Sequence, residues 1–377
     1  MAIDYSKIPS PCYVLDEALL KRNLNSIKDV AEQAEVEIIL AFKGFAMWSA
    51  FPIVREYLNG ATASSLNEAR LSFEEMKSKA HVYAPAYTDA EFDELTKYSS
   101  HITFNSIAQF KKFKSKVPKN ISCGLRVNPE WSDVETDLYN PASPNSRLGV
   151  TSEHLADGLP EGIEGLHFHV LCESNSHSLE KVLQNLEEKF GHLLSQVKWV
   201  NMGGGHLMTK KGYDVDHLIK ILKAFKSKHD VHVILEPGSA IAWETGDLVS
   251  SILDIVESNG VKTAILDCSF TCHMPDCLEM PYKPAVIGAS KDPIPGKPTY
   301  RLGGMSCLAG DFMSEYSFDK ELKIGDPIIF KDMIHYTMVK TTTFNGVAHP
   351  SIGIWKENGT FDLVKEFGYD DYKNRLS

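Results

Sequence analysis

Residues 197–206 read Val-Lys-Trp-Val-Asn-Met-Gly-Gly-Gly-His, and residues 231–239 read Val-His-Val-Ile-Leu-Glu-Pro-Gly-Ser. Each stretch is a short apolar, partly β-branched run that ends in glycine and polar side chains. Between the two runs lies a segment, 215–228, whose apolar residues recur at helical spacing. A strand, a glycine-rich turn, a helix and another strand form the repeating unit of parallel α/β sheets, so this region predicts the class of fold.

Six earlier runs of the same kind extend this rhythm toward the N-terminus. They are Val36–Phe42, Gly60–Ala63, His81–Ala84, His101–Phe104, Ile121–Val127 and Ile163–Val170. Helical spacing recurs at 66–77 and 178–194, and an earlier helix is expected over 17–34, behind a short extended piece at 11–15. Eight strands with intervening helices predict a (β/α)₈ barrel.

The residue pattern of the sequence changes after the eighth predicted strand. Proline and glycine become frequent, and strand-like runs appear at 263–266, 327–330 and 336–339. We therefore expect a second, mainly antiparallel β domain behind the barrel. The predicted limits are 12–244 for the barrel and 1–11 together with 245–377 for the β domain.

The amino-acid composition limits the kinds of molecule that the protein is expected to bind. The 377 residues contain 39 lysines and arginines against 50 aspartates and glutamates, a formal net charge of −11. That balance argues against nucleic acid or a membrane as the main partner and suits a cationic ligand. No apolar run reaches the roughly 18 residues of a membrane helix, and the N-terminus lacks a secretory signal pattern. An odd count of seven cysteines is typical of reduced thiols, so we expect a cytoplasmic protein.

In such a barrel the chemistry lies at the carboxyl ends of the strands. Lys43 ends the first strand, where an amine forms a Schiff base with an aldehyde or simply reaches solvent. Gly203-Gly204-Gly205, with Pro237-Gly238 after the next strand, either cradles a phosphate or makes a tight turn. Glu236 either pairs with a protonated ring nitrogen or forms a salt bridge at the rim. Together, the three parts are those that a pyridoxal 5′-phosphate (PLP) site requires.

Two further parts of the sequence contain polar side chains that allow either a functional or a structural interpretation. His169 lies at the end of the sixth strand and either stacks on a cofactor ring or is an ordinary structural histidine. The segment Cys268–Cys277 raises the question of zinc, but its spacing departs from paired cysteine motifs, and we expect no bound metal. Asp276 and Glu279 are candidates to bind an amine, unless they lie on a solvated loop face.

Five short motifs, taken together, carry a resemblance. They are Ala41-Phe42-Lys43-Gly44, His169-Val170-Leu171-Cys172-Glu173, Asp267-Cys268-Ser269, His273-Met274-Pro275-Asp276, and Gly-Gly-Met-Ser-Cys-Leu-Ala-Gly-Asp at 303–311. The whole chain resembles the fold-type III, alanine-racemase-like PLP-dependent decarboxylases. Within that family it is most similar to the branch that acts on carboxynorspermidine and carboxyspermidine. The resemblance implies a homodimer with shared active sites and a role in polyamine, namely spermidine, biosynthesis.

The resemblance also implies roles position by position. Lys43 matches the lysine that holds PLP, His169 the histidine stacked on its ring, and Glu236 the carboxylate at its ring nitrogen. The matches at the cofactor phosphate and around it are Gly203, Gly204, Gly205, Arg126 and Tyr336, while Gly238 is a candidate from its place after the eighth strand. Cys307 matches a cysteine of the partner subunit that returns a proton after CO₂ leaves. Asp311 matches a residue near the substrate, and Phe344 an aromatic residue near the leaving carboxylate.

The sequence departs from the ornithine-type members of that family. Ser239 stands where they carry an arginine after Glu-Pro-Gly, and Leu308 stands where an acidic residue follows the cysteine. We therefore expect a cationic, carboxylated polyamine as the substrate, with Asp276, Glu279 and Asp311 as ligands of its distal amines. The alternatives are a decarboxylase of diaminopimelate, lysine or ornithine, a non-catalytic PLP carrier, a racemase, and a zinc-binding interaction module.

Overall fold

The computed structural model of the protein describes residues 2–135 and 139–377 and consists of two units. One unit spans Asn23–Ile241, and the other joins the chain up to Arg22 to the chain from Ala242 onward. None of the described helices is long and apolar enough to cross a membrane.

The strands of the first unit are all parallel and form a closed ring. In chain order they are β2 (Glu37–Ile38), β3 (Leu40–Ala41), β4 (Ala61–Ala63), β5 (Ala80–Tyr83), β6 (Ser99–Phe104), β7 (Ser122–Arg126), β8 (Gly165–His167), β9 (Trp199–Asn201) and β10 (His232–Leu235). The ring order is β2-β10-β9-β8-β7-β6-β5-β4-β3. β2 and β3 are the two halves of one predicted strand, so eight strands make the ring, and the predicted barrel is confirmed.

Ile39, between β2 and β3, shows how the ring closes. Its N–H donates to the carbonyl of Leu235 at 3.0 Å, while the N–H of the next residue, Leu40, donates to Gly60 at 3.1 Å. The segment therefore pairs with β10 through its first half and with β4 through its second. Inside the ring the fully buried Ile39 and Ile234 pack with Trp199, which anchors this part of the core.

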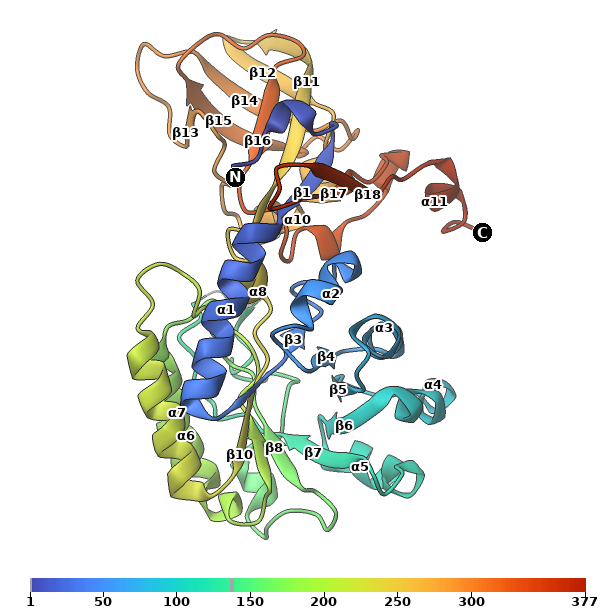
Figure 1. Ribbon diagram of the computed structural model, residues 1–377, viewed down its shortest axis with the longest axis vertical. Helices are drawn as coiled ribbons and strands as arrows, with labels where there is room; N and C mark the ends of the chain where they lie inside the picture. Colours follow the sequence, from blue (N-terminus) through green and yellow to red (C-terminus); the bar gives the residue numbers. More distant parts are fainter. Residues whose placement is uncertain (1, 136–138) are drawn as a thin grey trace. The chain divides into compact units, whose positions relative to one another are not determined.

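Helices lie around the ring of strands in Figure 1. Those labelled there are α1 (Glu17–Ala34), α2 (Phe51–Val54), α3 (Leu66–Leu71), α4 (Asp89–Leu95), α5 (Ile107–Phe113), α6 (Ser176–Leu194), α7 (Val215–His229) and α8 (Ser239–Ala242). α6 buries one apolar stripe, and the Oδ1 of Asn175 caps its first turn by accepting from Ser178 N at 3.0 Å. Asp214 caps α7 in the same way. The predicted helix over 66–77 is shorter, because a π turn over Ser72–Met76 follows α3.

The second unit is a mixed sheet. Its strands are β1 (Cys12–Asp16), β11 (Gly246–Ser258), β12 (Val261–Leu266), β13 (Ala289–Ser290), β14 (Thr299–Gly303), β15 (Phe312–Phe318), β16 (Pro327–Phe330), β17 (Ser351–Trp355) and β18 (Phe361–Lys365), with helices α9 (Phe270–His273), α10 (Pro275–Glu279) and α11 (Tyr369–Lys373). The order is β13-β15-β14-β12-β11-β1-β17-β18, and β16 pairs with β11. Six of the eight pairings are antiparallel, which confirms the mainly antiparallel character.

Two details of this unit differ from expectation. β1, which the predicted limits assign to the barrel, pairs here with β11 and β17, because Cys12 and Val14 pack against Val249 and Trp355. The expected strand at 336–339 is wrong. Tyr336 has a φ of 52°, in the left-handed region that a strand cannot use, and a short 3₁₀ turn over Met338–Lys340 follows it. Otherwise the predicted domain limits stay a prediction.

Candidate active site

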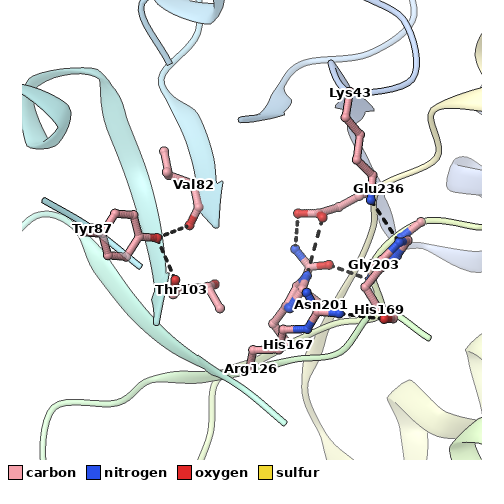
Figure 2. A network of polar contacts seen from close by, with 11 residues as sticks. Lys43, Val82, Tyr87, Thr103, Arg126, His167, His169, Asn201, Gly203 and Glu236 are labelled. Carbon is pink, nitrogen blue, oxygen red and sulfur yellow. Dashed lines mark hydrogen bonds and ion pairs between the residues drawn. The ribbon is translucent and has the colours of Figure 1, made fainter. Parts of the chain in front are cut away.

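Lys43 and His169 meet at the carboxyl ends of two strands of the barrel. Lys43 follows β3 and His169 follows β8, and Lys43 Nζ lies 3.0 Å from His169 Nε2 (Figure 2). On its other side, His169 Nδ1 accepts a hydrogen bond from Gly204 N at 2.8 Å. A neutral imidazole that accepts at Nδ1 carries its proton on Nε2, so the ring donates toward the lysine amine.

The protein around Lys43 and His169 shifts both groups toward their neutral forms. The Lys43 side chain is accessible to solvent, yet protein surrounds its amine, and this burial, together with the Arg126 charge, lowers the pKa of Lys43. Burial, reinforced by the Lys43 charge, likewise holds the pKa of His169 well below its usual range. The unprotonated amine is the form that attacks a carbonyl group, so a lowered pKa of Lys43 favours that reaction.

Glu236 provides a fixed negative charge at the end of β10. The residue is 8% exposed, and its Oε1 accepts from Asn201 Nδ2 at 2.6 Å. Its Oε2 lies 3.6 Å from His167 Nε2. Burial alone raises the pKa of a carboxylate, but the contacts with His167 and Asn201 outweigh it and hold the pKa of Glu236 at about 2. The carboxylate is therefore ionised at any physiological pH.

The glycine triplet leaves no room for side chains. A Cβ on Gly203 would lie 2.4 Å from the carbonyl oxygen of Phe168, and one on Gly205 would lie 2.2 Å from that of Leu171. Gly203 N donates to Asn201 Oδ1 at 2.9 Å and Gly204 N donates to His169, as described above. Among the hydrogen bonds of the described residues, the N–H of Gly205 has no acceptor. The triplet thus orients two polar side chains and leaves one backbone donor for an anion.

Gly238 and Arg126 complete the predicted set in this unit. A Cβ on Gly44, next to Lys43, would lie 2.8 Å from the Cα of Gly238, so these two turns approach closely. Arg126 is buried at the end of β7; its Nη2 donates to the carbonyl of His169 at 2.8 Å, and its guanidinium lies 4.6 Å from the ring centre of Tyr83. Arg126 therefore holds the backbone that carries His169.

Two functional side chains escaped the sequence analysis. Asn201 ties the Glu236 carboxylate to the glycine triplet through its two amide ends, and His167 contacts the same carboxylate. The sequence contained an indication of both residues. Asn201 directly precedes Met202 and the triplet, and His167 lies two residues before His169, the spacing that puts side chains on one face of a strand.

The remaining predicted residues all belong to the second unit. Asp311 is 4% exposed and accepts three hydrogen bonds: from Ser269 Oγ at 2.8 Å, from the backbone N–H of Thr271 at 3.0 Å and from that of Ser306 at 3.0 Å. Asp311 thus ties the start of α9 to Ser306, the residue before Cys307. Whether it also contacts substrate stays a prediction.

Cys307 and Phe344 lie close together on the surface of this unit. The backbone N–H of Cys307 donates to Asn345 Oδ1 at 2.8 Å, and Asn345 directly follows Phe344. The Cys307 thiol is exposed, and the Phe344 ring is 45% exposed. Tyr336 is half-buried, at the left-handed backbone position noted above.

Asp276 and Glu279 already hold a cation of this chain. Lys340 Nζ donates to Asp276 Oδ1 and, at 2.7 Å, to Glu279 Oε2. The three charges therefore form one cluster, and any second ammonium at these carboxylates would compete with Lys340. The neighbouring Cys268–Cys277 segment does not bring its thiols and imidazole together as a metal-binding group among the described residues.

The residues of the barrel unit fit PLP. The Lys43 amine, whose pKa is lowered, can bind an aldehyde, and the His169 imidazole beside it can stack on a ring. The buried Glu236 carboxylate can accept from a protonated ring nitrogen, and the free N–H of the glycine turn can donate to a phosphate. With the closed parallel barrel, this set defines a PLP-dependent enzyme of the alanine-racemase-like class. The family described as pyridoxal-dependent decarboxylase, C-terminal sheet domain, matches residues 12–334, and the chain belongs to this family.

Relatives with high sequence identity have more specific names than the family. A carboxyaminopropylagmatine decarboxylase from Synechocystis sp. is 52% identical, over 98% of this chain and 96% of that protein. A carboxynorspermidine/carboxyspermidine decarboxylase from Campylobacter jejuni is 47% identical, over 98% of this chain and 99% of that protein. The crystal structure of carboxynorspermidine decarboxylase from C. jejuni, complexed with norspermidine, superimposes with a TM-score of 0.91 at 45% identity and covers 98% of this chain and all of that one.

These findings confirm the predicted family, fold, cofactor and enzyme class. A structure of the diaminopimelate decarboxylase from Helicobacter pylori has a TM-score of 0.85 at only 15% identity, covering 98% of each chain, which supports the fold alone. The carrier, racemase and zinc-module alternatives find no support among these relatives.

Proposed function

We propose that this chain removes the carboxyl group of a carboxylated polyamine, carboxyspermidine or carboxynorspermidine, and releases spermidine or norspermidine for polyamine biosynthesis. One observation carries the proposal. Three relatives that are 37–52% identical, each matched over 98% of this chain, are all named as decarboxylases of carboxylated polyamine-like substrates. The diaminopimelate decarboxylases among the relatives are only 20–22% identical.

The barrel residues supply binding and charge. PLP, when bound, supplies the electron sink for the electron pair that remains on the substrate carbon after CO₂ departs. Lys43, whose pKa is lowered, offers its amine for the covalent attachment, and His169 orients that amine through its Nε2. Glu236 keeps a negative charge where a ring nitrogen must stay protonated.

The second unit supplies the later steps in this proposal. Cys307, with its exposed thiol, returns a proton to the carbon that has lost CO₂, and it does so in the active site of a partner subunit. Phe344 packs beside the departing carboxylate and shields it from water. Asp276, Glu279 and Asp311 attract the distal ammonium groups of the substrate. The enzyme is accordingly a homodimer with shared active sites, and it works in the cytoplasm.

A second substrate, carboxyaminopropylagmatine, has a specific observation in its favour. The Synechocystis relative that is named for it is 52% identical to this chain, against 47% for the carboxynorspermidine/carboxyspermidine enzyme. The two kinds of substrate differ at the far end, where agmatine carries a guanidinium group in place of an ammonium. A guanidinium makes bidentate contacts with a carboxylate, so the acidic residues of the second unit decide between them.

The test is CO₂ release by the purified enzyme, saturated with PLP, from carboxyspermidine, carboxynorspermidine, carboxyaminopropylagmatine and diaminopimelate at equal concentrations. We expect the highest kcat/KM on carboxyspermidine or carboxynorspermidine and no turnover by Lys43→Ala. A highest value on carboxyaminopropylagmatine selects the second substrate, and turnover of diaminopimelate alone contradicts both.

A further inference from the structure

Outside the candidate active site, two histidines and a glutamate come together on adjacent helices. His177 and Glu180 lie three residues apart in the first turns of α6, and His217 lies in the first turn of α7. One ligand atom from each of the three lies within 4.8 Å of the others. Among the described residues, no other set of histidine, cysteine and carboxylate side chains converges in this way.

The individual contacts in this cluster suit a cation. His217 Nε2 lies 3.4 Å from Glu180 Oε2, and the two imidazole rings stack with their centres 4.2 Å apart. His217 Nδ1 is buried without a hydrogen bond, so Nε2 is the atom of this ring that is open to a ligand. An imidazole nitrogen is the commonest protein ligand of transition-metal ions.

Asp214 adds a fourth ligand. Its Oδ1 caps α7 by accepting from His217 N at 2.9 Å, and its Oδ2 lies 3.8 Å from His177 Nε2. Two imidazoles and two carboxylates are a ligand set that zinc accepts, with ligand atoms about 3.3 Å apart around a tetrahedral ion, as follows from its bond lengths. His177, Glu180 and Asp214 are each about half exposed or more, so they can close the remaining distance by small rotations.

The helix dipoles oppose this site, because α6 and α7 both begin here and their N-termini are electropositive. The two carboxylates offset that effect: one of them caps a helix, and both face the imidazoles. We propose that His177, Glu180 and His217, with Asp214, bind one divalent transition-metal ion of the Zn²⁺ type.

The place of the site indicates what the ion does. α6 follows the loop after β8, which carries His169, and α7 follows the loop after β9, which carries the glycine triplet. The two loops already meet, since Ser174 N donates to the carbonyl of Gly205 at 2.9 Å. A metal that joins the starts of α6 and α7 stabilises this pair of loops. The inference does not depend on the substrate proposed above.

The test uses the full-length, PLP-loaded protein without a histidine tag, freed of metal by a chelator and titrated with Zn²⁺ in a calorimeter. We expect one equivalent to bind with a micromolar or lower Kd, and His177→Ala/His217→Ala to weaken that binding at least tenfold. His154→Ala, which removes an exposed histidine outside the cluster, is the matched control and leaves the Kd unchanged.

Two further readouts separate this site from binding to thiols. Co²⁺ in this site gives weak visible bands without a thiolate charge-transfer band, because the ligands are nitrogen and oxygen. Zn²⁺ raises the Tm of the wild type but not that of the double variant, because only a folded site gains from the ligand. Equal Zn²⁺ affinity in wild type and double variant, or binding only at millimolar Zn²⁺, would overturn the proposal.

Discussion

Glu236 is the residue at which one charge matters most. Its pKa of about 2 keeps the carboxylate ionised across the working pH range, and Glu236→Gln retains the shape and an acceptor for Asn201 while it removes that charge. We expect kcat to fall on the order of 10²-fold at saturating PLP, the usual effect of removing one preorganised electrostatic group. The measurement is steady-state CO₂ release, together with the Tm.

Glu164→Gln is the control for this substitution. Glu164 pairs with Lys198, and its backbone groups lie at the opposite, amino end of β8, before Gly165. Its loss leaves kcat unchanged. Equal kcat values for Glu236→Gln and the wild type would show that the carboxylate serves stability alone.

A second prediction for a single residue concerns Lys340. Its ammonium occupies the two carboxylates, Asp276 and Glu279, that are proposed to attract the distal amine of the substrate. Lys340→Met removes this internal competitor, so we expect the KM for the cationic substrate to fall about fivefold, the equivalent of a partly exposed ion pair of roughly 1 kcal/mol. Lys297→Met, which removes the exposed lysine paired with Asp319, is the control. A higher KM in Lys340→Met would mean instead that Lys340 positions the carboxylates.

The sequence reveals some of these residues and hides others for a physical reason. Lys43, His169 and Glu236 could be chosen because each follows an apolar strand, where barrel chemistry gathers. The hydrogen bond from Asn201 to Glu236 depends on the pairing of β9 with β10. The contact of Lys340 with Glu279 joins residues that are 61 positions apart in the sequence. Neither contact follows from local spacing, because tertiary pairing creates both.

Among the elements, the turn after β9 is the one that tolerates least change. A Cβ on Gly204 would lie 2.5 Å from the carbonyl oxygen of Glu236, closer than packing allows. Gly204→Ala therefore pushes the turn away from β10 and disturbs the hydrogen bond to His169. We expect the Kd for PLP to rise at least tenfold and stability to fall by about 1–3 kcal/mol, the usual range for overpacking.

Gly191→Ala is a matched control within the same unit. Gly191 lies inside α6, and a Cβ there meets nothing within 4 Å. Since alanine favours helix by about 1 kcal/mol over glycine, this variant should gain stability and keep its affinity for PLP. A Gly204→Ala protein that binds PLP like the wild type would contradict the role given to the turn. Absorbance titration with PLP measures both.

Element boundaries also show where sequence patterns fail. The predicted strand 36–42 divides into β2 and β3 at Ile39, although its N–H groups alternate between the β10 side and β4 on both sides of this break. The run 336–339 has strand-like residues, but the left-handed φ of Tyr336 turns the chain away. The hydrophobic pattern of a sequence indicates which segments are buried. It does not predict how a barrel closes or which backbone dihedral one residue adopts, because both depend on the rest of the fold.

For the whole molecule, the division of site residues between two units makes assembly testable. Lys43 belongs to one unit and Cys307 to the other. If active sites are shared across a dimer, a mixture of Lys43→Ala and Cys307→Ala proteins, each inactive alone, forms hybrid dimers with one intact site. Random exchange makes half of the dimers hybrid, so we expect about a quarter of wild-type activity after mixing. No recovery, in a mixture whose exchange is shown by mass spectrometry, would place both residues in one subunit's site.

Acid stability of the whole molecule depends on histidines that are buried in both units. Burial lowers the pKa of His101, His206 and His273 to about 4, whereas an unfolded histidine titrates near 6.5. Between these values the unfolded chain binds more protons than the folded one, so stability is full above pH 6.5 and falls as the pH drops toward 4. We expect a loss of about 1 kcal/mol per histidine between pH 7 and pH 5.5, measured from urea unfolding. His101→Phe keeps a ring against Trp199 but cannot titrate, so its stability should fall less over this range; an equal fall would show that other groups govern acid unfolding.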